Sequence, residues 1–243
     1  MESVNGGIHG VVAVGDSLLT GYGLALGGVS CLSWGGWLAW ALGTCLTQHA
    51  VNGATTPQVA RDQLPLLRGR YRLGVTWLGA NDLGRLDPDR FEREVAAVCA
   101  ALQSCCETVA VATLPRSLRG AGSSWRHEAA VRDEANARIR QVADATGVVL
   151  VELAEALVGP WSVAPDRHHP TSIGHLEAAH CAATALDAAH LRFARHLPDL
   201  AAVQVPKTER RLYDVAVTDR LRGAWDTLKH LRDDRVLTRA VAP

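Results

Sequence analysis

The sequence has no excess of charge of either sign. It contains 25 Lys and Arg residues against 25 Asp and Glu residues, so its formal net charge is zero at neutral pH. Nucleic acids and anionic membranes are bound through concentrated positive charge. The composition therefore argues against both as partners, and we expect a small-molecule substrate.

Long hydrophobic runs are also missing. The most apolar stretch, residues 34–46, is shorter than the roughly 20 apolar residues that a membrane-spanning helix needs. The first residues, MESVNGGIHG, lack the basic start and apolar run of a secretory signal. These features predict a cytoplasmic protein with no membrane insertion.

Cysteine is scarce and shows no metal-binding pattern. None of the six cysteines forms a CxxC pair, and no Cys/His spacing resembles a zinc site. Cys45, Cys99 and Cys181 fall in apolar helical patterns, which favours buried, reduced thiols. We expect no metal.

What the sequence does contain is an alternation of apolar runs and helical patterns. Each run is apolar at nearly every position, which is typical of strands buried on both faces of a parallel sheet. The runs cover residues 10–14, 49–52, 73–78, 108–113 and 148–153. The helical patterns cover residues 34–46, 56–67, 88–104, 125–146 and 171–197. This order predicts a three-layer α/β/α sandwich with a five-stranded parallel sheet.

Two segments allow more than one interpretation. Trp34, Trp37 and Trp40 are predicted to form a core-facing helix stripe, with ligand stacking as the alternative. After residue 197 no β-type run occurs, and apolar residues at helical spacing predict an amphipathic helix in a C-terminal extension, residues 198–243. We expect this extension to pack on the main domain, to close over the site as a lid, or to form the interface of a homodimer. The residues at helical spacing are Leu221, Trp225, Leu228 and Leu231.

Polar residues follow four of the predicted strands. Ligands bind at the carboxyl ends of the strands in an open parallel sheet, so these residues are candidates for a site. They occur in GDSLLTGYG after the first strand, VNGATT after the second, GAND after the third and DRHHP beyond the fifth. Each motif has little meaning alone, but their joint order at successive strand ends is specific.

Together these motifs resemble the four blocks of the GDSL-type, or SGNH, hydrolases. The matching residues are Ser17, Gly53, Asn81, and His169 with Asp166. The resemblance covers about residues 8–195, so that residues 1–197 form the SGNH hydrolase domain. It implies a flavodoxin-like strand order, 2-1-3-4-5, and a reaction without a cofactor. The GxSxG motif of the other large class of α/β hydrolases is absent.

The chemistry of these residues agrees with the resemblance. A serine hydroxyl needs an adjacent base, which His169 can supply, and Asp166 can hold the imidazole in the required tautomer. His168 is the competing base. The backbone N–H groups of Ser17 and Gly53, with the Asn81 amide, would form an oxyanion hole.

Asn81, Asp16 and Asp82 can also be interpreted as residues that stabilise the loops after the strands. Asn81 has a turn-forming role as its alternative. Asp16 and Asp82 are predicted to cap or brace their loops.

The predicted function is a serine esterase that hydrolyses a small soluble carboxylic ester or thioester through an acyl-enzyme on Ser17. Two alternatives remain. An acyltransferase would use the same acyl-enzyme with an alcohol, sugar or amine acceptor, and a binding module would have lost catalysis. The loops at residues 18–33 and 115–124 are the predicted determinants of specificity.

Overall fold

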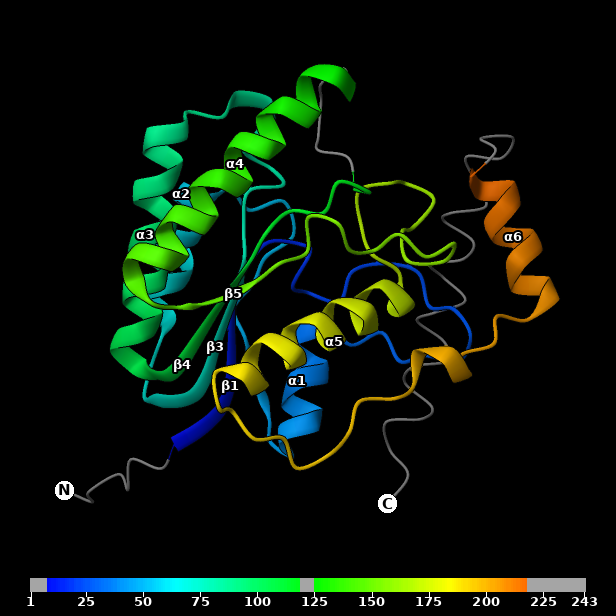
Figure 1. Ribbon diagram of the computed structural model, residues 1–243, viewed down its shortest axis with the longest axis horizontal. Coiled ribbons are helices and arrows are strands. Elements are labelled where there is room, and N and C mark those ends of the chain that lie inside the picture. Colours follow the sequence, from blue (N-terminus) through cyan, green and yellow to red (C-terminus); the bar gives the residue numbers. More distant parts are fainter. Residues whose placement is uncertain (1–7, 119–124, 218–243) are drawn as a thin grey trace.

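A five-stranded parallel sheet runs through the centre of the protein (Figure 1). The computed structural model describes residues 8–118 and 125–217. The strand order is β2-β1-β3-β4-β5, which confirms the predicted fold class and topology. The strands are β1 (Ile8–Gly15), β2 (Leu46–Gln48), β3 (Arg70–Trp77), β4 (Cys106–Ala112) and β5 (Val149–Val151).

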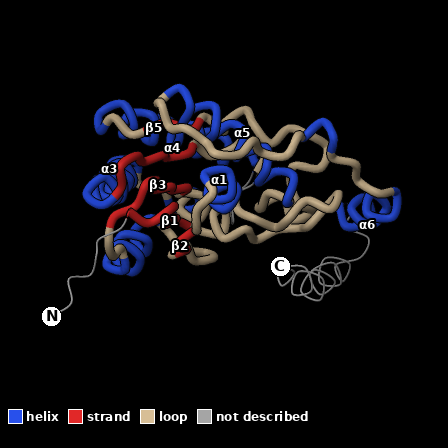
Figure 2. The backbone as a smooth tube through the Cα atoms, turned by 90° about the horizontal axis from the view of Figure 1, so that it is seen from below, coloured by secondary structure: helices blue, strands red, loops and turns tan. Residues whose placement is uncertain are grey.

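Helices cover both faces of this sheet (Figure 2). Helix α1 packs against α5, and α3 packs against α4. Because both faces are covered, consecutive residues of β1, Val11 to Val14, are all fully buried. This burial explains the continuous apolar runs in the sequence. The helices are α1 (Trp34–Leu42), α2 (Thr56–Gln58), α3 (Pro88–Cys105), α4 (Trp125–Thr146), α5 (Ser172–Ala188) and α6 (Lys207–Val217).

The tryptophan stripe faces the core, as predicted. Trp34 is fully buried and meets Trp77 edge to face, with ring centroids 6.2 Å apart. Trp37 is also buried, and Trp40 is half-buried with the Arg195 guanidinium 5.5 Å from its ring centroid. These aromatic rings therefore build the α1 side of the core.

The predicted boundary between the first helix and the second strand is wrong. Helix α1 ends at Leu42 because Gly43 adopts a left-handed conformation, with φ of 68°, and caps the helix. The chain therefore reaches the sheet earlier, and β2 occupies Leu46–Gln48 instead of residues 49–52. His49 and Val51 still donate backbone hydrogen bonds to β1, which keeps this segment beside the end of β1.

Two predicted helices also differ from the structure. Residues 56–67 form one α-helical turn followed by a π-helix, Val59–Gln63, and a 3-10 turn, Leu64–Leu66, which contains Pro65. Helix α5 ends at Ala188 instead of continuing to residue 197, because His190 takes a left-handed conformation with φ of 67°.

Several other predictions are decided only in part. The six cysteines are free. Of the three expected to be buried, Cys99 is buried and Cys181 is half-buried, whereas Cys45 is exposed because it lies beyond the end of α1. The predicted helix around Leu221 to Leu231 lies outside the described residues. Within those residues, no helix is both long enough and apolar enough to cross a membrane.

Candidate active site

Ser17 lies two residues after the end of β1, where the chain leaves the sheet, and hydrogen bonds fix the backbone before it. The side chain of Gln63 forms two hydrogen bonds of 2.8 Å with Gly15, one with its N–H and one with its carbonyl oxygen. A Cβ on Gly15 would lie 2.6 Å from the carbonyl oxygen of Trp77. Only glycine therefore fits there, and the π-helical turn that carries Gln63 helps to position Ser17.

His169 reaches Ser17 from the hairpin at residues 163–170. Its Nε2 lies 3.0 Å from the Ser17 Oγ, and its Nδ1 lies 2.8 Å from the Asp166 Oδ2. The other oxygen of Asp166 accepts the backbone N–H groups of His168, at 2.9 Å, and His169, at 3.1 Å. One carboxylate thus holds both the imidazole ring and the loop that carries it.

Asp166 is well suited to remain ionised. Burial alone would raise the pKa of its carboxyl group, but the hydrogen bond from His169 and the backbone N–H groups outweigh burial and lower it. An ionised Asp166 accepts a hydrogen bond from the N–H at Nδ1 of His169. This tautomer leaves Nε2 without a proton, so it can accept the Ser17 hydroxyl proton.

The structure distinguishes the two neighbouring histidines. The hydrogen bond to Ser17 is made by His169, while His168 lines a small cavity beside the site. Sequence reasoning missed Tyr22, whose ring meets the His169 imidazole edge to face with centroids 4.5 Å apart. The only sequence signal for Tyr22 is its place in the GDSLLTGYG motif.

Gly53 lies on the loop after β2, beside the end of β1. Val51 donates to the Gly15 carbonyl at 3.1 Å, and Thr20 donates through its hydroxyl to the Asn52 side chain at 2.7 Å. Gly53 has a φ of 78°, and a Cβ on it would meet no atom within 4 Å. The position requires glycine for its backbone conformation and leaves open space in front of its backbone.

Asn81 comes from the loop after β3, on the other side of β1. Its amide nitrogen donates to the carbonyl oxygen of Ala54 at 3.0 Å and to the Asp16 Oδ2 at 3.3 Å. Asp82, next to it, accepts hydrogen bonds from the backbone N–H and the hydroxyl of Thr56. The Asp16 and Asp82 carboxylates thus brace loops, in agreement with the prediction for them.

The position of Asp16 disfavours the charged form of its carboxyl group. It is fully buried, and its Oδ1 accepts the Leu18 N–H at 2.9 Å. The pKa of Asp16 is raised from 3.8 to about 7: burial is the largest cause, the nearby Asp82 also raises it, and the Leu18 N–H opposes them. Near neutral pH this carboxyl group is therefore close to its titration midpoint.

This raised pKa predicts a pH-dependent stability. From about pH 4 to pH 7 the folded protein keeps a proton on Asp16 that the unfolded chain has lost, so the free energy of unfolding falls as pH rises, by up to about 4 kcal/mol. Asp16→Asn cannot ionise. Urea unfolding at pH 5 and pH 8 should show wild type losing about 2 to 4 kcal/mol relative to the variant. An unchanged difference between the two proteins would contradict the raised pKa.

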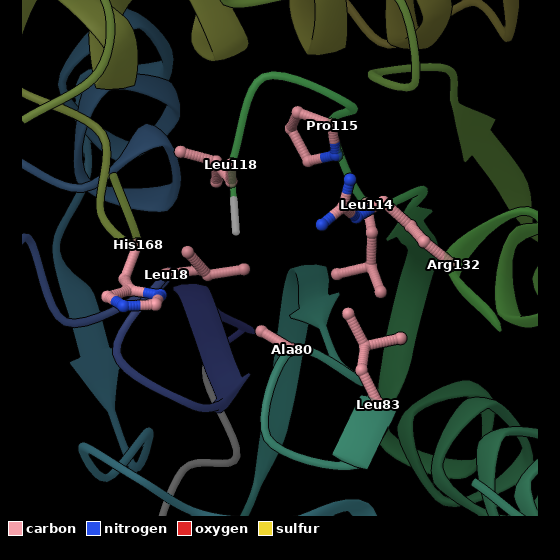
Figure 3. A pocket seen from close by; sticks show the side chains of 8 residues that line it. All are labelled: Leu18, Ala80, Leu83, Leu114, Pro115, Leu118, Arg132 and His168. Atoms are coloured by element: carbon pink, nitrogen blue, oxygen red, sulfur yellow. The ribbon is translucent and has the colours of Figure 1, made fainter. Parts of the chain in front are cut away.

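A small cavity lies between the loops that carry the predicted site residues (Figure 3). Its volume is about 10 Å³, close to that of one water-sized sphere. Leu18, Ala80 and His168, which line it, each directly neighbour one of the predicted site residues in the chain. Leucines close the other side, and Arg132 reaches in from α4, paired with the buried Glu128. The other lining residues are Leu83, Leu114, Pro115 and Leu118.

The second predicted specificity loop is described only at its start. Arg116 forms ion pairs with Asp133 and Glu155, so its charge is already neutralised by the protein. Residues 119–124 lie outside the described residues. Across residues 8–118 and 125–217, no group of three or more His, Cys, Asp or Glu side chains is arranged to hold a metal ion.

Several solved structures are similar to this chain. Axe2, an acetylxylan esterase from Geobacillus stearothermophilus, is 16% identical with a TM-score of 0.55, and the match covers 73% of this chain and 94% of that one. LAE5, an α/β hydrolase enzyme from the metagenome of Lake Arreo, is 19% identical with a TM-score of 0.56, over 75% of this chain and 97% of that one.

A third similar structure is a member of the lipolytic G-D-S-L family from Veillonella parvula. It is 14% identical with a TM-score of 0.58, over 72% of this chain and 97% of that one. At these identities the three structures show a shared fold. No curated protein matches the sequence.

A family model gives the more specific result. The model of the GDSL-like lipase/acylhydrolase family matches residues 13–176, well over half of the chain. The matched region contains every site residue named above, from Asp16 to His169. The chain therefore belongs to the GDSL-like lipase/acylhydrolase family.

Proposed function

We propose that this protein is a serine esterase that forms an acyl-enzyme on Ser17 and releases the acyl group to water. One observation carries the proposal. The Ser17 hydroxyl, the His169 imidazole and the Asp166 carboxylate form a continuous hydrogen-bonded chain, with distances of 3.0 and 2.8 Å. This arrangement is the one that activates a serine nucleophile.

The reaction follows from the roles of these groups. As the Ser17 Oγ attacks the ester carbonyl carbon, His169 Nε2 takes the hydroxyl proton, and Asp166 stabilises the imidazolium that forms. Collapse of the tetrahedral intermediate breaks the bond to the leaving oxygen, or sulfur in a thioester, which receives the proton from His169. A water molecule then attacks the acyl-enzyme with His169 again as the base, and the acid and free Ser17 are regenerated.

The oxyanion of the intermediate needs donors that are ready to receive it. Within the described part of the chain, the backbone N–H groups of Ser17 and Gly53 have no hydrogen-bond acceptor. Asn81 supplies a third donor by giving up its bond to Asp16, which at 3.3 Å is the longer of its two. These three groups support the proposed oxyanion hole.

The cavity between the loops of the site supports a short acyl group. Its volume of about 10 Å³ is close to that of one water-sized sphere, which suits the methyl group of an acetyl ester better than a longer alkyl chain. Its lining is mostly apolar, and the charge of Arg132 is offset by Glu128. We therefore propose acetyl or similarly small esters or thioesters as the substrates.

Alkylsulfonyl fluorides test both parts of this proposal, because the alkyl group takes the place of the acyl chain and fluoride leaves when Ser17 Oγ bonds to sulfur. Intact-mass analysis should show one adduct of methanesulfonyl fluoride on wild type and none on Ser17→Ala. Hexadecanesulfonyl fluoride should react at least about tenfold more slowly. An adduct that persists in Ser17→Ala would contradict the nucleophile, and equal rates for the two reagents would contradict the small acyl pocket.

A further inference from the structure

A C-terminal segment beyond the family match packs onto the site domain. This segment, residues 198–217, contains α6, which lies at the edge of the molecule away from the sheet (Figure 1). Its Val205 is buried in a small hydrophobic cluster with Leu24, Leu26 and Ile173. The cluster joins the C-terminal segment to the loop after β1 and to the start of α5.

Polar contacts strengthen this attachment. Glu209 of α6 accepts the backbone N–H of Gly27 at 2.7 Å. The guanidinium of Arg210 lies 5.9 Å from the ring centroid of Trp161, and its Nε donates to the Val205 carbonyl at 2.8 Å. Helix α6 is thus anchored on two separate loops of the main domain.

Tyr213 connects α6 to the hairpin that carries His169. Its ring meets Trp161 edge to face, with centroids 5.1 Å apart, and its hydroxyl donates to the carbonyl oxygen of Val163. Val163 pairs with Pro170 across the base of the hairpin. The next residue, Ala164, donates its N–H to the His169 carbonyl at 2.8 Å. The Tyr213 hydroxyl therefore holds the base of the hairpin at residues 163–170.

Burial helps to keep the Tyr213 hydroxyl a hydrogen-bond donor. Burial raises the pKa of its hydroxyl, Arg167 lowers it, and the carboxylates of Asp214 and Asp166 raise it again. With its pKa above the usual value near 10, the phenol stays protonated at neutral pH.

We propose that Tyr213 is a positioning residue of the esterase, which acts through Val163 to keep His169 within hydrogen-bond reach of Ser17. This inference rests on the proposed function. The hairpin has a left-handed residue, Arg167, with φ of 60°, a conformation that persists where surrounding contacts hold it, and the Tyr213 hydroxyl adds one such contact to the bonds inside the hairpin. A displacement of about 1 Å of a catalytic group can lower a rate about a hundredfold, so loss of one anchor has a measurable effect.

The test compares Tyr213→Phe with Arg211→Ala, an exposed position on the same helix. Tyr213→Phe keeps the ring against Trp161 and removes the hydroxyl. We expect kcat for an acetyl ester to fall about tenfold, with KM changed less than twofold, while Arg211→Ala behaves as wild type. Hydrogen–deuterium exchange should become at least threefold faster in residues 163–170 of Tyr213→Phe, and the thermal midpoints should show that all proteins are folded.

The outcomes separate this inference from the proposed function. Wild-type hydrolysis that does not depend on Ser17 would overturn the proposed function. Ser17-dependent hydrolysis with unchanged kcat and exchange in Tyr213→Phe would overturn the positioning role alone. Tyr213→Leu, which also removes the ring contact, should lower kcat further, and a smaller loss than in Tyr213→Phe would count against the inference.

Discussion

His169→Ala is expected to lower kcat for ester hydrolysis by at least about 10⁴-fold, because it removes the imidazole whose Nε2 lies 3.0 Å from the Ser17 Oγ and is the proposed acceptor of its proton. The measurement is steady-state hydrolysis of an acetyl ester at saturating concentration. His168→Ala is the matched control, since the two histidines are adjacent and share the Asp166 loop. We expect it to retain kcat within tenfold. A larger loss in His168→Ala than in His169→Ala would reverse the assignment of the base.

The same substitution also tests whether the triad acts as a unit. Ser17→Ala should cause a loss similar to that of His169→Ala, and the double variant should lose no more than the worse of the two. The reason is that neither residue contributes once the other is absent. If the loss of kcat in the double variant equalled the product of the two single losses, the two residues would act independently, which would contradict the mechanism.

Asn81→Ala is expected to lower kcat by about 10² to 10³-fold, because it removes one of three proposed donors to the oxyanion. The bonds to Ala54 and Asp16 are also lost, so part of the effect could come from the loop. A thionoester separates the two causes, since its sulfur accepts hydrogen bonds poorly. The preference of wild type for the oxygen ester over the thionoester should shrink at least fivefold in Asn81→Ala. A preserved preference would assign Asn81 to loop bracing alone.

Much of the fold could be predicted because its signals are local. Uniformly apolar runs indicate strands that are buried on both faces, and β1, β3, β4 and β5 lie where such runs occur. Boundaries were less predictable where one residue's backbone conformation decides them. Gly43 ends α1 four residues early, and this moves β2 along the chain. The π-helical turn at Val59–Gln63 has no local signal, because it is stabilised by the bonds between Gln63 and Gly15.

The sequence by itself predicted the candidate residues of the site. Ser17, Gly53, Asn81, Asp166 and His169 follow strands or lie in recognisable motifs, and parallel strands bring their carboxyl ends to one edge of the sheet. Only the tertiary structure decided how far Asp16 is buried, that the Tyr22 ring meets the His169 imidazole, and that Tyr213 reaches Val163 across 50 residues of chain. The physical reason is that these features depend on contacts between segments distant in sequence. Their geometry comes from packing of the whole domain, whereas the motifs reflect the local backbone and chemistry alone.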